Sequence, residues 1–167
     1  MMYNIQVIII DDHPIVLQGF SHILQYEANI TLLASFTTAL EGIVFMEEHR
    51  VDVVLLDINM PDMGGIEACE IIKKYHADCK VIAISNNNEN SIIQRMLQSG
   101  ASGYILKNAS AEELVNAIRA VEEGFTALSE DVKIIIQSSK TVNLPKITRR
   151  ENEILRLLAK GMTSPEI

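Results

Sequence analysis

The stretch that decides the fold is VIIIDDHPIV, residues Val7 to Val16. Its first four residues are branched and apolar, which is typical of a strand buried on both faces of a sheet. The run stops at two adjacent carboxylates, Asp11 and Asp12. Because two unit charges about 4 Å apart repel by about 4 kcal/mol at an effective dielectric constant near 20, this pair needs a partner that offsets its charge.

The same pattern of a short apolar run followed by an amphipathic helix recurs along the chain. Apolar residues three or four positions apart, such as Leu114 and Ile118, predict the helices, and Ser110 with Glu113 forms a capping box. The predicted strands are Ile5–Ile10, Ile30–Phe36, Val51–Leu56, Val81–Ile84 and Tyr104–Leu106. Apolar strands that alternate with helices predict an α/β fold, a (βα)5 domain whose parallel sheet is covered on both faces.

Length and composition limit the classes of protein. A chain of 167 residues with 48% hydrophobic residues can form one domain of about 120 residues and an appendage. No apolar run approaches the roughly 20 residues of a membrane span, and the start of the chain lacks signal-peptide features, so we expect a cytoplasmic protein with no membrane partner. Cys69 and Cys79 lack a CxxC or His-bearing motif, which predicts reduced thiols and no metal site between them.

Charge is unevenly distributed along the chain. Residues 1–140 hold 9 Lys and Arg against 19 Asp and Glu, a net charge of −10, whereas residues 141–167 hold 5 against 3, a net charge of +2. The acidic body therefore argues against a broad nucleic-acid surface there, and the mildly basic end leaves that activity open for the last segment.

Polar residues follow the ends of four predicted strands. Asp11 and Asp12 come after the first, Asp57 after the third, Ser85 after the fourth and Lys107 after the fifth. Each has a simple structural explanation, such as helix capping by Asp12 or a solvated charge at Lys107. The carboxyl ends of parallel strands share one edge, however, so the coincidence favours a site. Three clustered carboxylates need protons, water or a cation, and Mg²⁺, with Mn²⁺ as the alternative, fits best.

Two sets of motifs resemble a known family. Asp11 and Asp12, the segment DINMPDMGG from Asp57, Ser85, and GASGYILK ending at Lys107 together resemble the receiver domain of two-component response regulators. The final segment ITRRENEILRLLAKGMTSPEI resembles the start of a LuxR-type helix-turn-helix domain. The chain is therefore similar to the NarL/FixJ class of transcriptional regulators.

The resemblance implies a domain organisation. It predicts a flavodoxin-like receiver domain with a five-stranded parallel sheet over residues 1–124, a linker over 125–146 with a short helix at Ser129–Gln137, and the N-terminal fragment of a LuxR-type DNA-binding domain over 147–167. In such domains the recognition helix comes after the helix that SPEI begins. We therefore expect the full-length form to bind promoter DNA and the 167-residue chain not to select a promoter sequence.

The resemblance also implies roles for the residues at the strand ends. Asp57 is the expected phosphoacceptor, which takes a phosphoryl group from a sensor histidine kinase. Asp12 is expected to bind magnesium directly and Asp11 mainly through water, while Asp57 and the backbone carbonyl of Asn59 complete the protein ligands. Lys107 is expected to pair with the phosphoryl oxygens.

Further residues are implied to act in switching. Ser85 is expected to donate its hydroxyl to a phosphoryl oxygen, and Tyr104 to be the aromatic ring that turns inward in response. Asn59 and Asn87 occupy positions that tune phosphate hydrolysis in the family. Asn108 replaces a proline that follows the lysine in many receivers, although the NarL/FixJ class commonly lacks it.

Two other functions remain as alternatives. One is a metal-dependent phosphatase with an aspartyl-phosphate intermediate, although such enzymes usually carry Asp-x-Asp after the first strand. The other is a receiver-like interaction module that works without phosphorylation. As a response regulator, the chain is expected to catalyse only its own magnesium-dependent phosphorylation and dephosphorylation. A homodimer through the first and fifth helices is a candidate assembly, with the fourth helix, fifth strand and fifth helix as the other output face.

Overall fold

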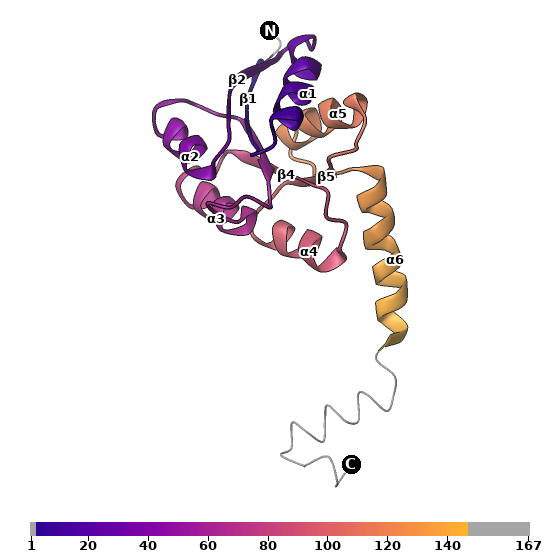
Figure 1. Ribbon diagram of the computed structural model, residues 1–167. Coiled ribbons are helices and arrows are strands. Elements are labelled where there is room, and N and C mark those ends of the chain that lie inside the picture. The colour runs from indigo at the N-terminus through magenta and orange to yellow at the C-terminus, as the bar shows by residue number, and fades with distance from the viewer. Residues whose placement is uncertain (1–2, 147–167) are drawn as a thin grey trace, which may run out of the picture.

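The computed structural model describes residues 3–146, which form an α/β domain around one parallel sheet (Figure 1). Its strands are β1 (Ile5–Ile10), β2 (Ile30–Phe36), β3 (Val53–Asp57), β4 (Lys80–Ser85), β5 (Gly103–Leu106) and β6 (Ala127–Leu128). Its helices are α1 (Pro14–Gln25), α2 (Ala39–Glu48), α3 (Gly65–Tyr75), α4 (Asn90–Gln98), α5 (Ala111–Glu122) and α6 (Glu130–Lys146). The strand order β2-β1-β3-β4-β5-β6 contains the predicted flavodoxin-like order of five strands.

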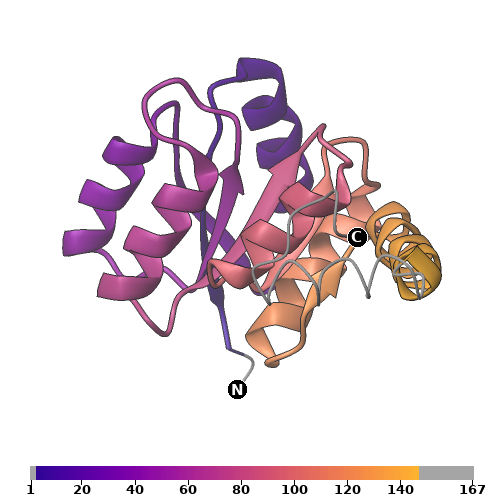
Figure 2. The same ribbon diagram turned by 90° about the horizontal axis from the view of Figure 1, so that it is seen from below.

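Helices cover both faces of the sheet (Figure 2). Helices α1 and α5 pack on one face, and α2, α3 and α4 pack on the other. The apolar run of β1 serves both layers, because Val7 and Ile9 join the first core and Ile8 and Ile10 join the second. This division explains why the strand is apolar at consecutive positions.

The register of the strands aligns their carboxyl ends. Ile10 of β1 pairs with Leu56 of β3, so the next residue along each strand is an aspartate. Ser85 of β4 pairs with Leu106 of β5, and the Lys107 backbone N–H donates to the Ser85 carbonyl at 2.9 Å. The polar residues that follow the apolar runs therefore share one edge of the sheet, as the sequence predicts.

A short sixth strand was not predicted. Ala127 of β6 pairs with Gly103 of β5, and a Cβ atom at Gly103 would lie 2.6 Å from the Ala127 carbonyl oxygen. Only a residue without a side chain allows this approach. Two residues are too few to produce a recognisable strand pattern in the sequence.

The helix expected at Ser129–Gln137 is present and longer than predicted. It begins at Glu130, continues to Lys146, and contacts α4 and β5, with Val132 and Ile136 buried. Its first part is therefore packed against the domain.

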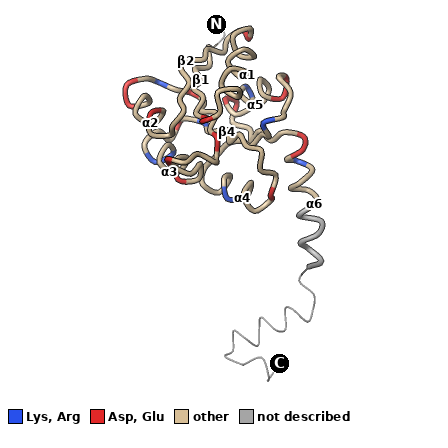
Figure 3. Tube along the Cα trace, in the orientation of Figure 1, with Lys and Arg blue, Asp and Glu red and all other residues tan. Residues whose placement is uncertain are grey.

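Residues 147–167, where the sequence predicts the start of a LuxR-type domain, lie outside the described residues. Among residues 3–146, no helix combines the length and apolar character needed to cross a membrane. Acidic and basic residues are both distributed over the described chain (Figure 3).

Candidate functional site

Two buried carboxylates lie side by side at the carboxyl edge of the sheet. The side chain of Asp11 is 0% exposed and that of Asp57 is 1% exposed, whereas Asp12 is 30% exposed. Lys107 Nζ lies 3.0 Å from Asp11 Oδ2 and 3.4 Å from Asp57 Oδ1, and the lysine side chain is itself only 7% exposed. One ammonium group thus pairs with both buried carboxylates, which would otherwise carry uncompensated charge.

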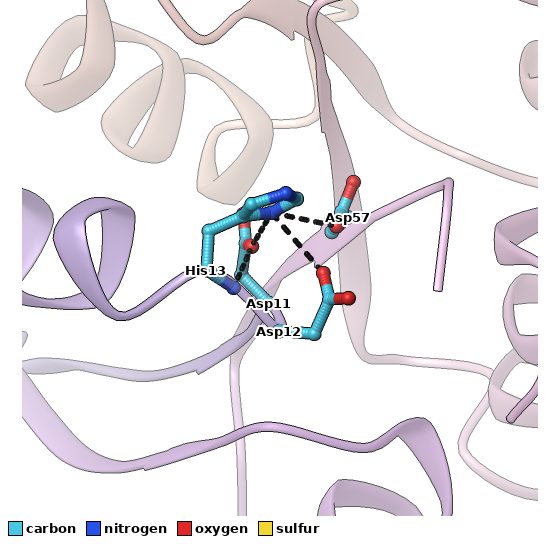
Figure 4. Close-up of side chains that lie close together, drawn as sticks. All are labelled: Asp11, Asp12, His13 and Asp57. Carbon is cyan, nitrogen blue, oxygen red and sulfur yellow. Dashed lines mark hydrogen bonds and ion pairs between the residues drawn. The ribbon is translucent and has the colours of Figure 1, made fainter. Parts of the chain in front are cut away.

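A histidine that the sequence analysis did not single out lies among these groups (Figure 4). The Nδ1 atom of His13 is 2.8 Å from Asp11 Oδ1, 3.1 Å from Asp12 Oδ1 and 3.7 Å from Asp57 Oδ2. It also lies 3.2 Å from Lys107 Nζ. The one available sequence signal was its position directly after the two aspartates.

Several carboxylate oxygens in this cluster lack a hydrogen-bond partner among the described residues. These buried atoms are Asp11 Oδ2, Asp12 Oδ1 and Asp57 Oδ2. The first is in ion-pair contact with Lys107, and the other two are in ion-pair range of His13. One potential ligand atom from each of the three aspartates and from His13 lies within 4.8 Å of all the others. Such a set of hard oxygen donors fits a divalent cation.

The surroundings of Asp57 act on the pKa of its carboxyl group in both directions, and the largest effect is burial. Burial raises the pKa of its carboxyl group above the ordinary value, and the negative charge of Asp11 acts in the same direction. The hydrogen bond from the Asn59 backbone N–H, 3.2 Å from Asp57 Oδ1, and the positive charge of Lys107 both oppose this rise in pKa. An added positive charge would therefore favour the ionised carboxylate.

The loop that follows Asp57 is anchored at several points. The Asp62 side chain accepts hydrogen bonds from the backbone N–H groups of Ala39 (3.1 Å) and Leu40 (3.3 Å), at the first turn of α2. Gly65 packs so closely that a Cβ atom there would lie 2.5 Å from Ile58 Cα. These contacts hold the backbone around Asn59. The role of Asp62 was not predicted, because its partners lie more than twenty residues away.

Ser85, Asn87 and Tyr104 form a connected group beside the carboxylates. Ser85 Oγ is buried and accepts the Asn87 backbone N–H at 2.8 Å, while the hydroxyl of the fully buried Tyr104 donates to the Asn87 carbonyl at 2.8 Å. Burial raises the pKa of Tyr104, so the phenol stays protonated as a donor. The Asn87 side chain accepts the Glu89 backbone N–H at 2.8 Å. Tyr104 and Ser85 thus fix the same loop between β4 and α4.

The predicted site residues differ in how close they lie to the carboxylate cluster. Asp11, Asp12 and Asp57 place carboxylate oxygens within 4.8 Å of one another, and Lys107 pairs with Asp11 and Asp57. Ser85 lies at the same edge. The side chain of Asn59 is exposed.

Comparison with known proteins gives consistent matches. The family profile of the response regulator receiver domain matches residues 7–119. The response regulator UvrY of Escherichia coli K12 is 32% identical over 169 residues, which cover 98% of this chain and 78% of UvrY. The nitrate/nitrite response regulator NarL of the same organism is 29% identical, with 96% of this chain and 78% of NarL covered.

A solved structure matches nearly the whole chain. RcsB from Salmonella enterica serovar Typhimurium, bound to promoter rprA in the presence of the phosphomimetic BeF3⁻, aligns with a TM-score of 0.76 and 27% identity. The alignment covers 98% of this chain and 81% of RcsB.

Proposed function

Because this chain belongs to the response regulators of two-component systems and carries their receiver domain, we propose that Asp57 accepts the phosphoryl group. The observation that carries this proposal is the position of the buried Asp57 carboxylate between the Lys107 ammonium and the Asn59 backbone N–H. The transcription regulators among its relatives are of the LuxR and NarL type.

In the proposed reaction an Asp57 carboxylate oxygen attacks the phosphorus atom of a phosphohistidine on a sensor histidine kinase. An O–P bond forms as the N–P bond breaks, and the electron pair of the broken bond stays on the kinase imidazole, which takes up a proton. The product is an aspartyl phosphate. Hydrolysis of that acyl phosphate by water later restores the Asp57 carboxylate.

Three aspartates are the proposed ligands for the cation. Mg²⁺, or Mn²⁺ as the alternative, would contact Asp12 and Asp57 directly and Asp11 mainly through water, with the Asn59 backbone carbonyl as a further ligand. The buried oxygens without hydrogen-bond partners support this assignment. When bound, the cation offsets the negative charge of the attacking carboxylate and of the phosphoryl oxygens.

Lys107 and Ser85 supply the remaining contacts to the phosphoryl group in this proposal. The Lys107 ammonium already lies 3.4 Å from Asp57 Oδ1 and would pair with a phosphoryl oxygen. Donation of the Ser85 hydroxyl to another phosphoryl oxygen would pull on the loop that Ser85 and Tyr104 hold at Asn87. The exposed Asn59 and the half-buried Asn87 are the proposed positions that tune hydrolysis.

The output is proposed to be regulated transcription. We assign residues 1–124 to the receiver domain, 125–146 to the linker and 147–167 to a LuxR-type DNA-binding segment. Helix α6 contacts β5 and also α4, the helix that follows the Asn87 loop. A rearrangement of this loop would therefore reach α6 through α4. A second copy of the chain is a candidate partner, since a related structure contains RcsB dimers bound to DNA.

Magnesium-dependent labelling with acetyl phosphate tests the proposal. Stable, stoichiometric labelling that is lost in the Asp57→Asn variant is the expected result. Turnover of added phosphomonoesters without a stable label would instead favour the phosphatase, and neither reaction would favour the inert interaction module. Undiminished labelling of Asp57→Asn would contradict the assignment of the phosphoacceptor.

A further inference from the structure

The imidazole of His13 points into the carboxylate cluster from the start of α1 (Figure 4). We propose that His13 supplies a nitrogen ligand to the cation bound there and so makes this site select Mn²⁺ over Mg²⁺ more strongly than its oxygen ligands alone would. The inference rests on the proposed function only in that a divalent cation binds among the three aspartates.

The spacing of the potential ligand atoms supports coordination by His13. Adjacent ligands of an octahedral ion with bonds of about 2.1 Å lie roughly 3.0 Å apart, and opposite ligands roughly 4.2 Å apart. The His13 Nδ1 atom lies 3.1 Å from Asp12 Oδ1 and 3.7 Å from Asp57 Oδ2. Each of these two separations falls in the range that two ligands of one ion adopt. Coordination would replace the present contacts of Nδ1 with Asp11 Oδ1 at 2.8 Å and with Lys107 Nζ at 3.2 Å.

The two oxygens that face the imidazole are buried and need a partner. Asp57, 1% exposed, directs Oδ2 into the cluster without a hydrogen bond from the described residues, and so does Asp12 through Oδ1. Each of these atoms is within ion-pair range of His13 Nδ1 but has no hydrogen-bond partner among the described residues. Because Lys107 pairs with the other oxygen of Asp57, the side of Asp57 that faces His13 is left for the cation.

The local backbone holds His13 in place. Its backbone N–H donates to Asp11 Oδ1 at 2.8 Å, and Pro14 begins α1 directly after it. The fixed φ of proline restricts the chain at this point, and the residue before it is held in the extended region, as φ −99° and ψ 109° show. The ring therefore starts from a constrained position next to the carboxylates.

Ligand chemistry gives the direction of the selectivity. Mg²⁺ is a hard ion that prefers oxygen ligands and keeps several of its waters, so an imidazole adds little to its binding. Mn²⁺ lies on the transition-metal series, in which imidazole nitrogen is a common ligand. A nitrogen donor from His13 should raise the affinity for Mn²⁺ much more than the affinity for Mg²⁺.

Metal titrations of the 167-residue chain and two variants test the proposal. Free Mn²⁺ is followed by its electron paramagnetic resonance signal, and Mg²⁺ affinity by calorimetry. His13→Ala should lower the Mn²⁺ affinity about 10-fold or more, as loss of a metal-site contact typically does, and change the Mg²⁺ affinity by less than about 2-fold. His22→Ala is the matched control, because His22 is an exposed histidine on α1, the helix that begins directly after His13.

Pulsed resonance of bound Mn²⁺ gives a direct readout of the ligand. A nitrogen coupling should be present in the wild type and in His22→Ala, and absent in His13→Ala. Unchanged or tighter Mn²⁺ binding in His13→Ala, or no nitrogen coupling in the wild type, would overturn the role of His13 while leaving the aspartate site intact. Failure of the wild type to bind either ion would overturn this inference and the proposed cation site together.

Discussion

Replacing Asp57 by Asn should stabilise the fold when no divalent cation is present. The substitution keeps the shape of the side chain and removes one negative charge from a buried cluster. Oxygens of Asp11 and Asp12 lie within 4.8 Å of an Asp57 oxygen, so each repulsion amounts to at least about 3.5 kcal/mol at an effective dielectric constant near 20. The lost attraction to Lys107, 3.4 Å away, is about 5 kcal/mol on the same basis.

Removal of the two repulsions outweighs the lost attraction by about 2 kcal/mol, so the free energy of unfolding of the variant should be higher by that amount. This corresponds to a rise in Tm of roughly 4–8 °C for a chain of this size. The direction agrees with the raised pKa of Asp57. A carboxyl group with a raised pKa in the fold contributes stability that is complete below its unfolded pKa, near 3.8, and is lost as pH rises through the folded pKa. The advantage of Asp57→Asn should therefore be larger at pH 7 than at pH 4.

Thermal melts at pH 7 in chelator, and again in excess Mg²⁺, measure this effect. Mg²⁺ should stabilise the wild type more than the variant, because the cation supplies the missing positive charge. Asp52→Asn is the matched control, since Asp52 is a buried aspartate that accepts hydrogen bonds from the Tyr3 hydroxyl at 2.6 Å and the Gln6 backbone N–H at 2.8 Å. It should lose about 1–3 kcal/mol.

A lower Tm for Asp57→Asn than for the wild type in chelator would refute the electrostatic reasoning. A gain of equal size in Asp52→Asn would also refute it, because the gain would then follow from amide substitution in general.

Three further predictions concern other residues. Asp12→Ala should weaken Mg²⁺ binding more than Asp11→Ala. Asp11→Ala should lower the Tm more, because alanine removes the acceptor of the His13 backbone N–H and leaves a gap at a fully buried side chain. Calorimetry and thermal melts measure the two effects, and equal values for the two variants would contradict the assignment. Tyr104→Phe removes the hydrogen bond to the Asn87 carbonyl and should lower the free energy of unfolding by about 1 kcal/mol. An unchanged midpoint of urea unfolding would contradict a stabilising role for this hydrogen bond. Burial raises the pKa of Cys79 to about 12, so its thiol should resist alkylation at pH 8 in the native protein and react only on unfolding. Rapid labelling of Cys79 in the native protein would contradict this prediction.

The features that follow from strand geometry could be predicted from the sequence. The apolar residues of β1 pack alternately against the helices on the two faces of the sheet. Consecutive apolar residues in the sequence already indicate this burial on both faces. Asp57 and Lys107 were predicted to share one edge because they follow parallel strands of one sheet, and β3 and β5 both pair with β4, which lies between them. Periodicity and strand order therefore locate the site without knowledge of any side-chain contact.

The features that depend on long-range side-chain contacts could not be predicted. Asp62 was given no role from the sequence, yet its side chain accepts hydrogen bonds from the first turn of α2. Asp52 lay inside the predicted third strand, yet it precedes β3 and holds Tyr3 and Gln6. His13 carried no motif signal, because a histidine before a proline reads as an ordinary helix start. In each case the partner is fixed by tertiary packing.

Mapping the modified residue after acetyl phosphate treatment shows which carboxylate accepts the phosphoryl group. Borohydride converts an aspartyl phosphate into homoserine, so peptide mass spectrometry identifies the carboxylate that carried the phosphoryl group. We expect homoserine at position 57 in the presence of Mg²⁺ and unmodified aspartate there in chelator. Homoserine at Asp11, Asp12 or Asp62 with Asp57 unmodified would contradict this expectation.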